Sequence, residues 1–260
     1  MNVVVCIKQV PGITDVKINP QTNTLMREGI KSVINPFDAH ALEEGVRLKE
    51  QHGGVVRVMS MGPRQAEDML REAISLGADE AVLLSDAAFA GSDTWATAYT
   101  LAGGIRKSGQ CDLVICGRQT LDGDTGQVGP ELSEMLGIPF VAYVCKIEEI
   151  SGGKARVKRM VDEGYEVVET PLPAVMTVTK EINVPRLPSL RGVARARKAA
   201  IPTWTANDLG LDPGRVGLPG SFTRVVRVFS PKRTAKGEIF QGDLASQVER
   251  LAEKLKSASM

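Results

Sequence analysis

The chain has 260 residues, 43% of them hydrophobic, which is enough to form one large α/β domain, alone or with an extension. Its formal net charge of +1 gives no strong overall field, which argues against nucleic acid or an acidic membrane as a partner. No apolar run approaches the roughly 20 residues that a membrane-spanning helix needs. The chain starts with a strand-like apolar run and not with a signal peptide, so we expect a cytoplasmic protein.

The cysteines and histidines do not support a metal or hydrolase site. The two histidines, His40 and His52, fall in one expected helix, which leaves a zinc site or a Ser-His-Asp triad short of partners. No CxxC pair occurs, so we expect the cysteines to be reduced and mostly buried. They are Cys6, Cys111, Cys116 and Cys145.

Short apolar runs alternate with helical periodicity in the first half of the chain. This alternation predicts right-handed βαβ units and a doubly wound, mostly parallel sheet. Asp38, Ser92 or Asp93, and Asp124 are expected helix caps. The expected strands are 2–8, 55–60, 81–84 and 112–116, and the expected helices are 38–51, 64–76, 94–107 and 126–136.

The pattern changes after residue 140. Runs at 141–147, 155–161, 165–169 and 174–179 read as consecutive strands, with a hairpin turn at Gly152-Gly153, and we expect them to extend the sheet in antiparallel fashion. Prolines then punctuate residues 185–219, and a short amphipathic helix is expected at 244–255. We therefore expect an α/β domain at 1–183 and a C-terminal arm at 184–260 that wraps a partner subunit.

The loop between the fourth strand and the fourth helix is the strongest candidate site. In a doubly wound sheet, ligands bind beyond the carboxyl ends of the strands. Glycines at 123, 126 and 129 allow close backbone approach, and a helix N-terminus presents free N–H groups to an anion. Neither a Walker A nor a GxGxxG motif is present. Asp124 is expected to cap the helix and Asp122 to bond a ribose hydroxyl or loop amides; a capped turn without any ligand is the alternative.

Two further groups lie at the same expected edge. Thr94 and Thr97 share one helix face and suit a phosphate or ribityl group, although a cap and a surface threonine would explain them equally well. Asn35-Pro36-Phe37-Asp38 begins the first long helix, where Phe37 could pack on a base and capping is the plainer interpretation. The basic stretch lacks interleaved aromatics, which favours a solvated face or an acidic partner over nucleic acid. It comprises Arg186, Arg191, Arg195, Arg197 and Lys198.

These segments resemble, in order, the beta subunit of electron transfer flavoproteins, from the first strand to about Gly237. The matching segments are Val3 to Lys8, Asn35-Pro36-Phe37, Glu43 to Lys49, Gly62-Pro63, Gly77-Ala78-Asp79, Gly117 to Gly129, 157–166, Leu172 to Val175 and 183–190. The resemblance implies an adenine-nucleotide-binding fold and a heterodimer with an alpha subunit that holds an FAD. Ordinary members bind AMP in the beta subunit, whereas electron-bifurcating members hold a second FAD there, which NADH reduces.

Two stretches are most similar to the bifurcating type: Phe89 to Thr97 and Asp122 to Pro130. The resemblance then implies an electron carrier that oxidises NADH only in complex with the alpha subunit. Electrons would pass to ferredoxin or flavodoxin and, through the alpha-subunit FAD, to an acyl-CoA dehydrogenase-like partner. An ordinary carrier with structural AMP, and a stand-alone adenine-nucleotide sensor, remain as alternatives.

The resemblance also assigns residues. Thr94 and Thr97 would meet the flavin, Leu190 matches the exposed leucine of the dehydrogenase-docking loop, and Glu166 matches a glutamate that influences electron transfer to the partner. The remaining cofactor-binding residues would be Cys6, Asn35, Pro36, Phe37, Asp38, Met61, Gly62, Asp122, Gly123, Asp124, Thr125, Gly126, Gln127, Val128, Gly129, Pro130, Glu131, Leu132 and Ser133.

Overall fold

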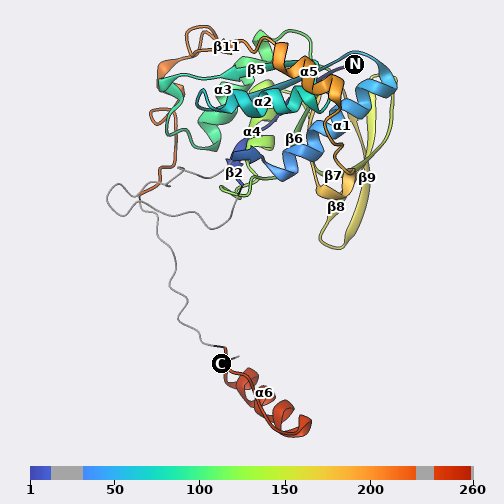
Figure 1. Cartoon of the computed structure of the whole chain (residues 1–260), viewed down its shortest axis with the longest axis vertical. Coiled ribbons are helices and arrows are strands. Elements are labelled where there is room, and N and C mark those ends of the chain that lie inside the picture. The colour runs from blue at the N-terminus through green and yellow to red at the C-terminus, as the bar shows by residue number, and fades with distance from the viewer. Residues whose placement is uncertain (13–31, 227–236, 259–260) are drawn as a thin grey trace. The chain divides into compact units, whose positions relative to one another are not determined.

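The computed structural model describes residues 1–12, 32–226 and 237–258, and the chain forms two compact units. The first unit runs to Val226 and contains the sheet, many of whose strands are labelled in Figure 1. The second contains helix α6 (Leu244–Ala258), which confirms the helix expected at the C-terminus. Within this unit, the carboxylate of Glu238 pairs with Arg250 and Lys254.

Nine strands form the sheet, in the order β11-β5-β4-β1-β6-β10-β7-β8-β9. The chain moves outward from β1 to β4 and β5 and then returns to place β6 on the other side of β1. The strand order therefore reverses between β1 and β6, which is the switch point where doubly wound folds bind ligands. The strands are β1 (Asn2–Cys6), β4 (Val55–Met61), β5 (Glu80–Leu84), β6 (Leu113–Gly117), β7 (Phe140–Ser151), β8 (Lys154–Val161), β9 (Gly164–Pro171), β10 (Ala174–Val178) and β11 (Thr203–Trp204).

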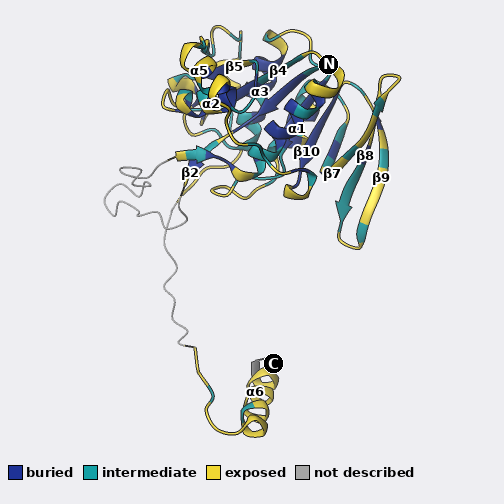
Figure 2. Cartoon of the chain, turned by 45° about the vertical axis from the view of Figure 1, so that its right-hand side comes forward, coloured by how far each residue is buried: buried dark blue, intermediate teal, exposed yellow. Residues whose placement is uncertain are grey.

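Helices cover both faces of the sheet because its central strands are apolar on both sides. In β1, Val3 and Val5 join one buried cluster, which includes apolar residues of α1 (Pro36–His52) and α2 (Ala66–Ser75). Val4 and Cys6 join the other, with α3 (Thr94–Lys107) and α4 (Val128–Leu136). Figure 2 shows the central strands buried, whereas the β8–β9 hairpin is largely exposed or intermediate. The expected three-layer α/β fold is confirmed.

The expected antiparallel extension is confirmed for β8 and β9 but wrong for the last strand. β10 lies between β6 and β7 and is parallel to both. All five of its residues, Ala-Val-Met-Thr-Val, are buried, because it has neighbours on both edges and helices on both faces. A short apolar run without alternation is typical of such a central strand, so the signal was present in the sequence.

The proline-punctuated segment makes more contact with its own chain than the sequence predicts. Helix α5 (Leu190–Lys198) packs on α2, where Arg71 donates to the carbonyls of Ala196 at 2.9 Å and Ala199 at 3.0 Å. Strand β11 pairs with the end of β5. Residues 184–226 thus belong to the first compact unit, which extends beyond the expected boundary at residue 183, and their binding to a partner stays a prediction.

The remaining short elements connect these parts. They are β2 (Gln9–Pro11), paired with β3 (Ser32–Ile34), and the 3-10 turns η1 (Ala87–Phe89), η2 (Lys180–Ile182) and η3 (Pro213–Arg215). In the described part of the chain, no helix has the length and apolar character to cross a membrane.

The central position of β10 predicts unequal effects of one substitution at two sites. Val175→Ala removes methyl groups from a fully buried side chain and should lower the free energy of unfolding by about 2 kcal/mol. Val167→Ala, on the edge strand β9 where the valine is 49% exposed, should cost less than about 0.5 kcal/mol. Urea titrations of both variants measure the difference, and equal losses would contradict the central placement.

Candidate nucleotide site at the switch point

The structure brings most of the predicted cofactor residues to one edge of the sheet. Cys6 and Met61 end their strands, and Thr94 opens α3. The segment Asn35–Asp38 lies at the start of α1, and the loop 122–127 leads into α4. Because the carboxyl ends of parallel strands meet at one edge, residues far apart in the sequence converge around β1 and β6.

Asp38 joins the ends of β1 and β6. One carboxylate oxygen accepts the backbone N–H of Lys8 at 2.7 Å, and the other accepts the N–H of Gly117 at 3.1 Å. The expected capping role is wrong: Asn35 is the N-cap residue, Pro36 opens α1, and Asp38 lies in its first turn, only 4% exposed. Burial raises the pKa of Asp38 to about 7, although the bonds from Lys8 and Gly117 oppose the rise. Asp38 therefore holds the switch point together.

Asn35 performs the same task for the loop that follows β6. Its side chain is fully buried; the amide donates to the carbonyl of Gln119 at 2.8 Å, and the amide oxygen accepts the N–H of Leu121 at 3.2 Å. The neighbouring Phe37 contacts the guanidinium of Arg118. The side chains of Asn35 and Asp38 are thus occupied by protein groups, and a direct contact between them and a ligand stays a prediction.

The two aspartates of the loop have partners other than those expected. Asp122 pairs with the ammonium of Lys8 at 2.7 Å, across the mouth of the switch point. Burial raises the pKa of Asp122, but the hydrogen bond and charge of Lys8 outweigh it and lower the pKa overall. Asp124 accepts from the side chain of Gln119 and has a φ of 53°. It does not cap the helix, because α4 begins later, after Gln127.

The N-terminus of α4 has no side-chain cap. Gln127 makes no capping hydrogen bond, and the first N–H groups of a helix have no partner within it. Gly129 lets this turn approach β10 closely, since a Cβ there would lie 2.4 Å from Cγ2 of Thr177. Uncapped N–H groups at a switch point are suited to an anion such as phosphate.

A second polar group lies where α3 and α4 begin. Asp93 caps α3 by accepting the N–H of Ala96 at 3.0 Å, which confirms one of the two expected caps. The hydroxyl of Thr94 donates to Oε1 of Glu131 at 3.0 Å, while Oε2 of Glu131 is buried with no hydrogen-bond partner in the described structure. Burial raises the pKa of Glu131, the Thr94 bond opposes it, and the charge of Asp93 adds to it. The unpaired oxygen marks an incomplete hydrogen-bond network.

Two cysteines lie beside each other at the centre of the sheet. Cys6 and Cys116 are neighbours on β1 and β6, and both are buried. The hydrogen bond between the two free thiols, together with burial, raises the pKa of Cys6 well above its ordinary value, so its thiolate is disfavoured. Among the described residues, no group of histidine, cysteine and carboxylate side chains could hold a metal ion.

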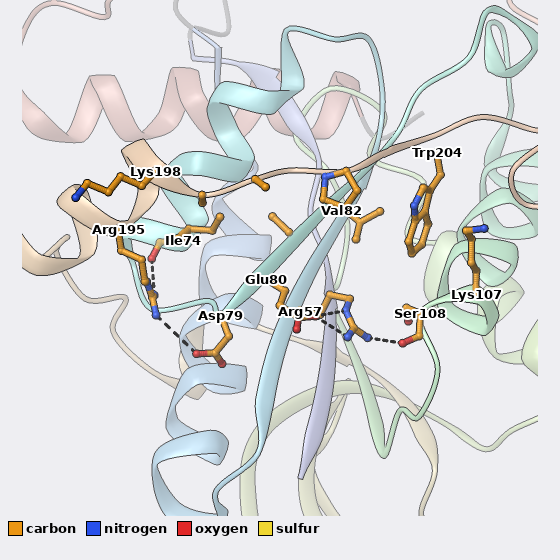
Figure 3. Close-up of a pocket in the computed structure, with 14 residues that line it drawn as sticks. Arg57, Ile74, Asp79, Glu80, Val82, Lys107, Ser108, Arg195, Lys198 and Trp204 are labelled. Atoms are coloured by element: carbon orange, nitrogen blue, oxygen red, sulfur yellow. Dashed lines mark hydrogen bonds and ion pairs between the residues drawn. The ribbon is translucent and has the colours of Figure 1, made fainter.

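A groove of about 560 Å³ lies elsewhere, along the edge of β5, and none of the predicted site residues lines it. Figure 3 shows Trp204 and Lys107 on one side and Arg195 beside Asp79 on the other. The arginines there are already paired, Arg57 with Glu80 and Arg195 with Asp79. The groove is therefore separate from the switch point.

The two predicted docking residues also lie outside the switch point. Leu190 opens α5 and is 91% exposed, on a turn in which the hydroxyl of Ser189 accepts the N–H of Gly192. Glu166 lies on the edge strand β9, where its carboxylate is 3.8 Å from Arg159. Both positions are accessible to a partner.

Comparison with known proteins identifies the family. The chain matches the electron transfer flavoprotein domain over residues 22–209. It is 51% identical over 258 residues to the electron transfer flavoprotein subunit beta of Thermoanaerobacterium thermosaccharolyticum, covering 99% of this chain and 98% of that protein. The chain belongs to the electron transfer flavoprotein family, as a beta subunit.

Other members of the family are also similar. The caffeyl-CoA reductase-Etf complex subunit CarD of Acetobacterium woodii is 48% identical over 258 residues, with 98% of each chain covered. Protein FixA of Azorhizobium caulinodans is 45% identical over 243 residues, covering 91% of this chain and 86% of that protein. The resemblance read from the motifs is thus confirmed.

Two basic residues at this edge of the sheet were not predicted as site residues from the sequence. Lys8 and Arg118 each follow the last residues of a central strand, β1 and β6, and both lie among the residues that converge there. Their positions directly after buried apolar runs were the available signal, because such positions lie at the carboxyl edge.

The raised pKa of Asp38 predicts a pH-dependent stability. Between its ordinary value of 3.8 and about 7, the folded state binds a proton that the unfolded state has lost. The contribution of the Asp38 carboxyl to the free energy of unfolding is therefore largest below pH 4 and falls as the pH rises to 7. Asp38→Asn removes this decline, and the two proteins should differ by no more than about 2 kcal/mol at pH 4, where both side chains are neutral.

Urea titrations of both proteins from pH 4 to pH 8 measure the effect. The stability of the wild type relative to the variant should fall across this range. A difference that stays constant with pH would show that Asp38 ionises normally.

Proposed function

We propose that this chain is the beta subunit of an electron-bifurcating flavoprotein and binds FAD at the switch point between β1 and β6. The observation that carries the proposal is the uncapped N-terminus of α4 at the carboxyl edge, preceded by the glycine-containing loop 122–127. Such a helix end suits a diphosphate. The same site would take AMP in an ordinary electron carrier, which is the alternative that the experiment below separates.

The residues of the loop 122–127 and of the start of α3 fit a ligand that extends from one to the other. Gly123 and Gly126 leave the loop without bulky side chains, and residues 121–125 are exposed. The buried oxygen of Glu131 lacks a partner beside Thr94, so the network at the start of α3 is open to completion by a ligand or by a proton. Asn35 and Asp38 would hold the loop and the strand ends in place without themselves reacting.

The relatives support assembly of this chain into a larger electron-transfer complex. CarD carries the name of a caffeyl-CoA reductase complex, and FixA is a further member at 45% identity. By analogy, this chain would work in a heterodimer with an alpha subunit that holds another FAD. NADH would supply the electrons, and ferredoxin or flavodoxin and a dehydrogenase would receive them.

The flavin would supply the redox chemistry, and the chain's own groups would bind and orient it. The α4 N–H groups would hold the phosphates. Thr94 and Thr97, on the first turn of α3, would face the ring. Thr94 already donates its hydrogen to Glu131, so its oxygen remains as an acceptor for a donor group.

The exposed apolar residues near the end of the first unit and on α6 suit the alpha-subunit contact. Phe222, Val225 and Val226 are each at least 80% exposed. Leu244, Val248 and Leu251 recur on one face of α6. An apolar stripe of this kind is stable in water only when another surface covers it.

The first experiment counts flavin. The chain co-expressed with its alpha subunit should retain two FAD per heterodimer and should reduce an artificial acceptor with NADH. One FAD with one AMP, and no NADH activity, would favour the ordinary carrier. A stable monomer that does not assemble would favour a stand-alone nucleotide sensor.

The exposed Leu190 predicts a separate effect on docking. Leu190→Ala should slow electron transfer to the partner dehydrogenase by roughly tenfold, because truncation removes an apolar anchor. The flavin content should not change, since α5 packs on α2 and the leucine itself points to solvent. Val167→Ala, on an exposed position of β9, is the control. Loss of flavin in the Leu190 variant would contradict the docking role.

A further inference from the structure

Tyr143, on β7, has a backbone conformation that tyrosine rarely adopts. Its φ is 57°, and among the described non-glycine residues only Asp124 also has a positive φ. The left-handed region is unfavourable for a bulky side chain and persists only where the surrounding structure enforces it. Such strain is typical of positions where the side chain serves a function.

A β-bulge enforces this conformation. Val141 and Val144 are both buried in the same cluster, three residues apart where a regular strand would place them two or four apart. The pairing of β7 shifts register at this point, and the N–H of Tyr143 donates to the hydroxyl of the buried Thr177 at 3.2 Å. A bulge at this position redirects a side chain, and it leaves Tyr143 43% exposed.

The redirected ring meets Arg118. The guanidinium lies 5.8 Å from the centre of the Tyr143 ring and 5.2 Å from that of Phe37. Nε donates to Gln119, which also donates to Asp124, so the arginine is tied to the loop that precedes α4. Among the described residues, neither Nη atom makes a hydrogen bond or an ion pair.

The two Nη atoms of the Arg118 guanidinium are hydrogen-bond donors in one plane, and neither has an acceptor among the described residues. Lys8, another cation at this edge, is committed to Asp122. Arg118 has only a weak effect on the pKa of the carboxyl of Glu181. Burial is the largest influence and raises that pKa, whereas hydrogen bonds and nearby charges, with Arg118 among the weakest, lower it overall. Arg118 is therefore available for an oxyanion, and a planar fork suits phosphate or carboxylate.

We propose that Arg118, held between Phe37 and Tyr143, binds a phosphate oxyanion of a nucleotide at the switch point. This inference rests on the proposed function, since it takes a nucleotide to be the ligand. The phosphate can belong either to the nucleotide resident in the subunit or to a dinucleotide that exchanges electrons with it. Both present the same chemistry to Arg118.

The test compares heterodimers carrying Arg118→Gln, Arg118→Lys and the control Arg156→Gln, which alters an exposed arginine on β8. Calorimetry on heterodimers whose switch-point site has been emptied of FAD or AMP gives the affinities for AMP and adenosine. Their ratio isolates the phosphate contact from the adenine contact. The KM for NADH is measured at constant flavin content.

Arg118→Gln should lower the preference for AMP over adenosine, or raise the KM for NADH, by roughly 10- to 100-fold, as expected for a lost charge-assisted contact. A changed ratio assigns the phosphate to the resident nucleotide, and a changed KM assigns it to the dinucleotide. Arg118→Lys should lose less, and Arg156→Gln should match the wild type. If neither quantity changes in Arg118→Gln, the proposal is overturned.

Tyr143→Gly separates binding from folding. Glycine adopts the positive φ without strain, so the unfolding temperature should stay within a few degrees of the wild type. The preference for AMP over adenosine should nevertheless fall, because the ring that contacts one side of the Arg118 guanidinium has been removed. A large drop in unfolding temperature with unchanged preference would give Tyr143 a purely structural role. The flavin count of the wild type tests the proposed function separately, since an AMP-binding carrier would still show the Arg118 effect.

Discussion

The carboxylate of Asp38 is the constraint on which the switch point depends. It receives backbone N–H groups from the ends of β1 and β6, the two strands between which the strand order reverses. A switch point separates two neighbouring strands whose connections leave in opposite directions, so the chain itself does not bridge them. Asp38 supplies that bridge from α1, and Asn35 extends it to the loop after β6. These two side chains hold the segments that follow β1 and β6.

This bridge requires the carboxylate of Asp38 to be buried. Burial favours its neutral form, whereas each N–H donor favours the charged form, and the result is a group that titrates near neutrality. The neighbouring Lys8 offers its backbone N–H to Asp38 but its ammonium to Asp122. One residue thus ties together the strand end, the first helix and the glycine-containing loop.

The sequence was sufficient for the central fold and for the edge of the sheet at which the candidate site lies. Apolar runs alternating with helical periodicity identified β1, β4, β5 and β6, and the loop before α4 was placed at the correct edge. Long-range order was harder to infer. The apolar run of β10 is typical of a central strand, but no local pattern indicates that it lies between β6 and β7, because strand order depends on contacts between residues distant in the sequence. For the same reason α5 and β11 were read as part of an extended arm.

The side-chain pairings at the site were the least predictable. Asp38 and Asp124 both precede or begin helices, and each has the residue type of a cap, yet neither acts as one. Asp38 bonds two strand ends, because those donors are brought near it only by the folded sheet, and Asp124 bonds Gln119 within its own loop. Local propensity therefore located the loops but not the partners within them.

The two edges of the sheet have a consequence for the subunit before it meets a partner. An open sheet offers unpaired backbone groups at both sides, which invite pairing with another copy. At one side β11 covers only the end of β5, at Leu83 and Leu84, and the chain then turns away. At the other, β9 carries Glu166 and Glu169 and ends at Pro171, which cannot donate a hydrogen bond. A short strand at one edge, and charges with a proline at the other, protect the newly made chain from strand-mediated aggregation.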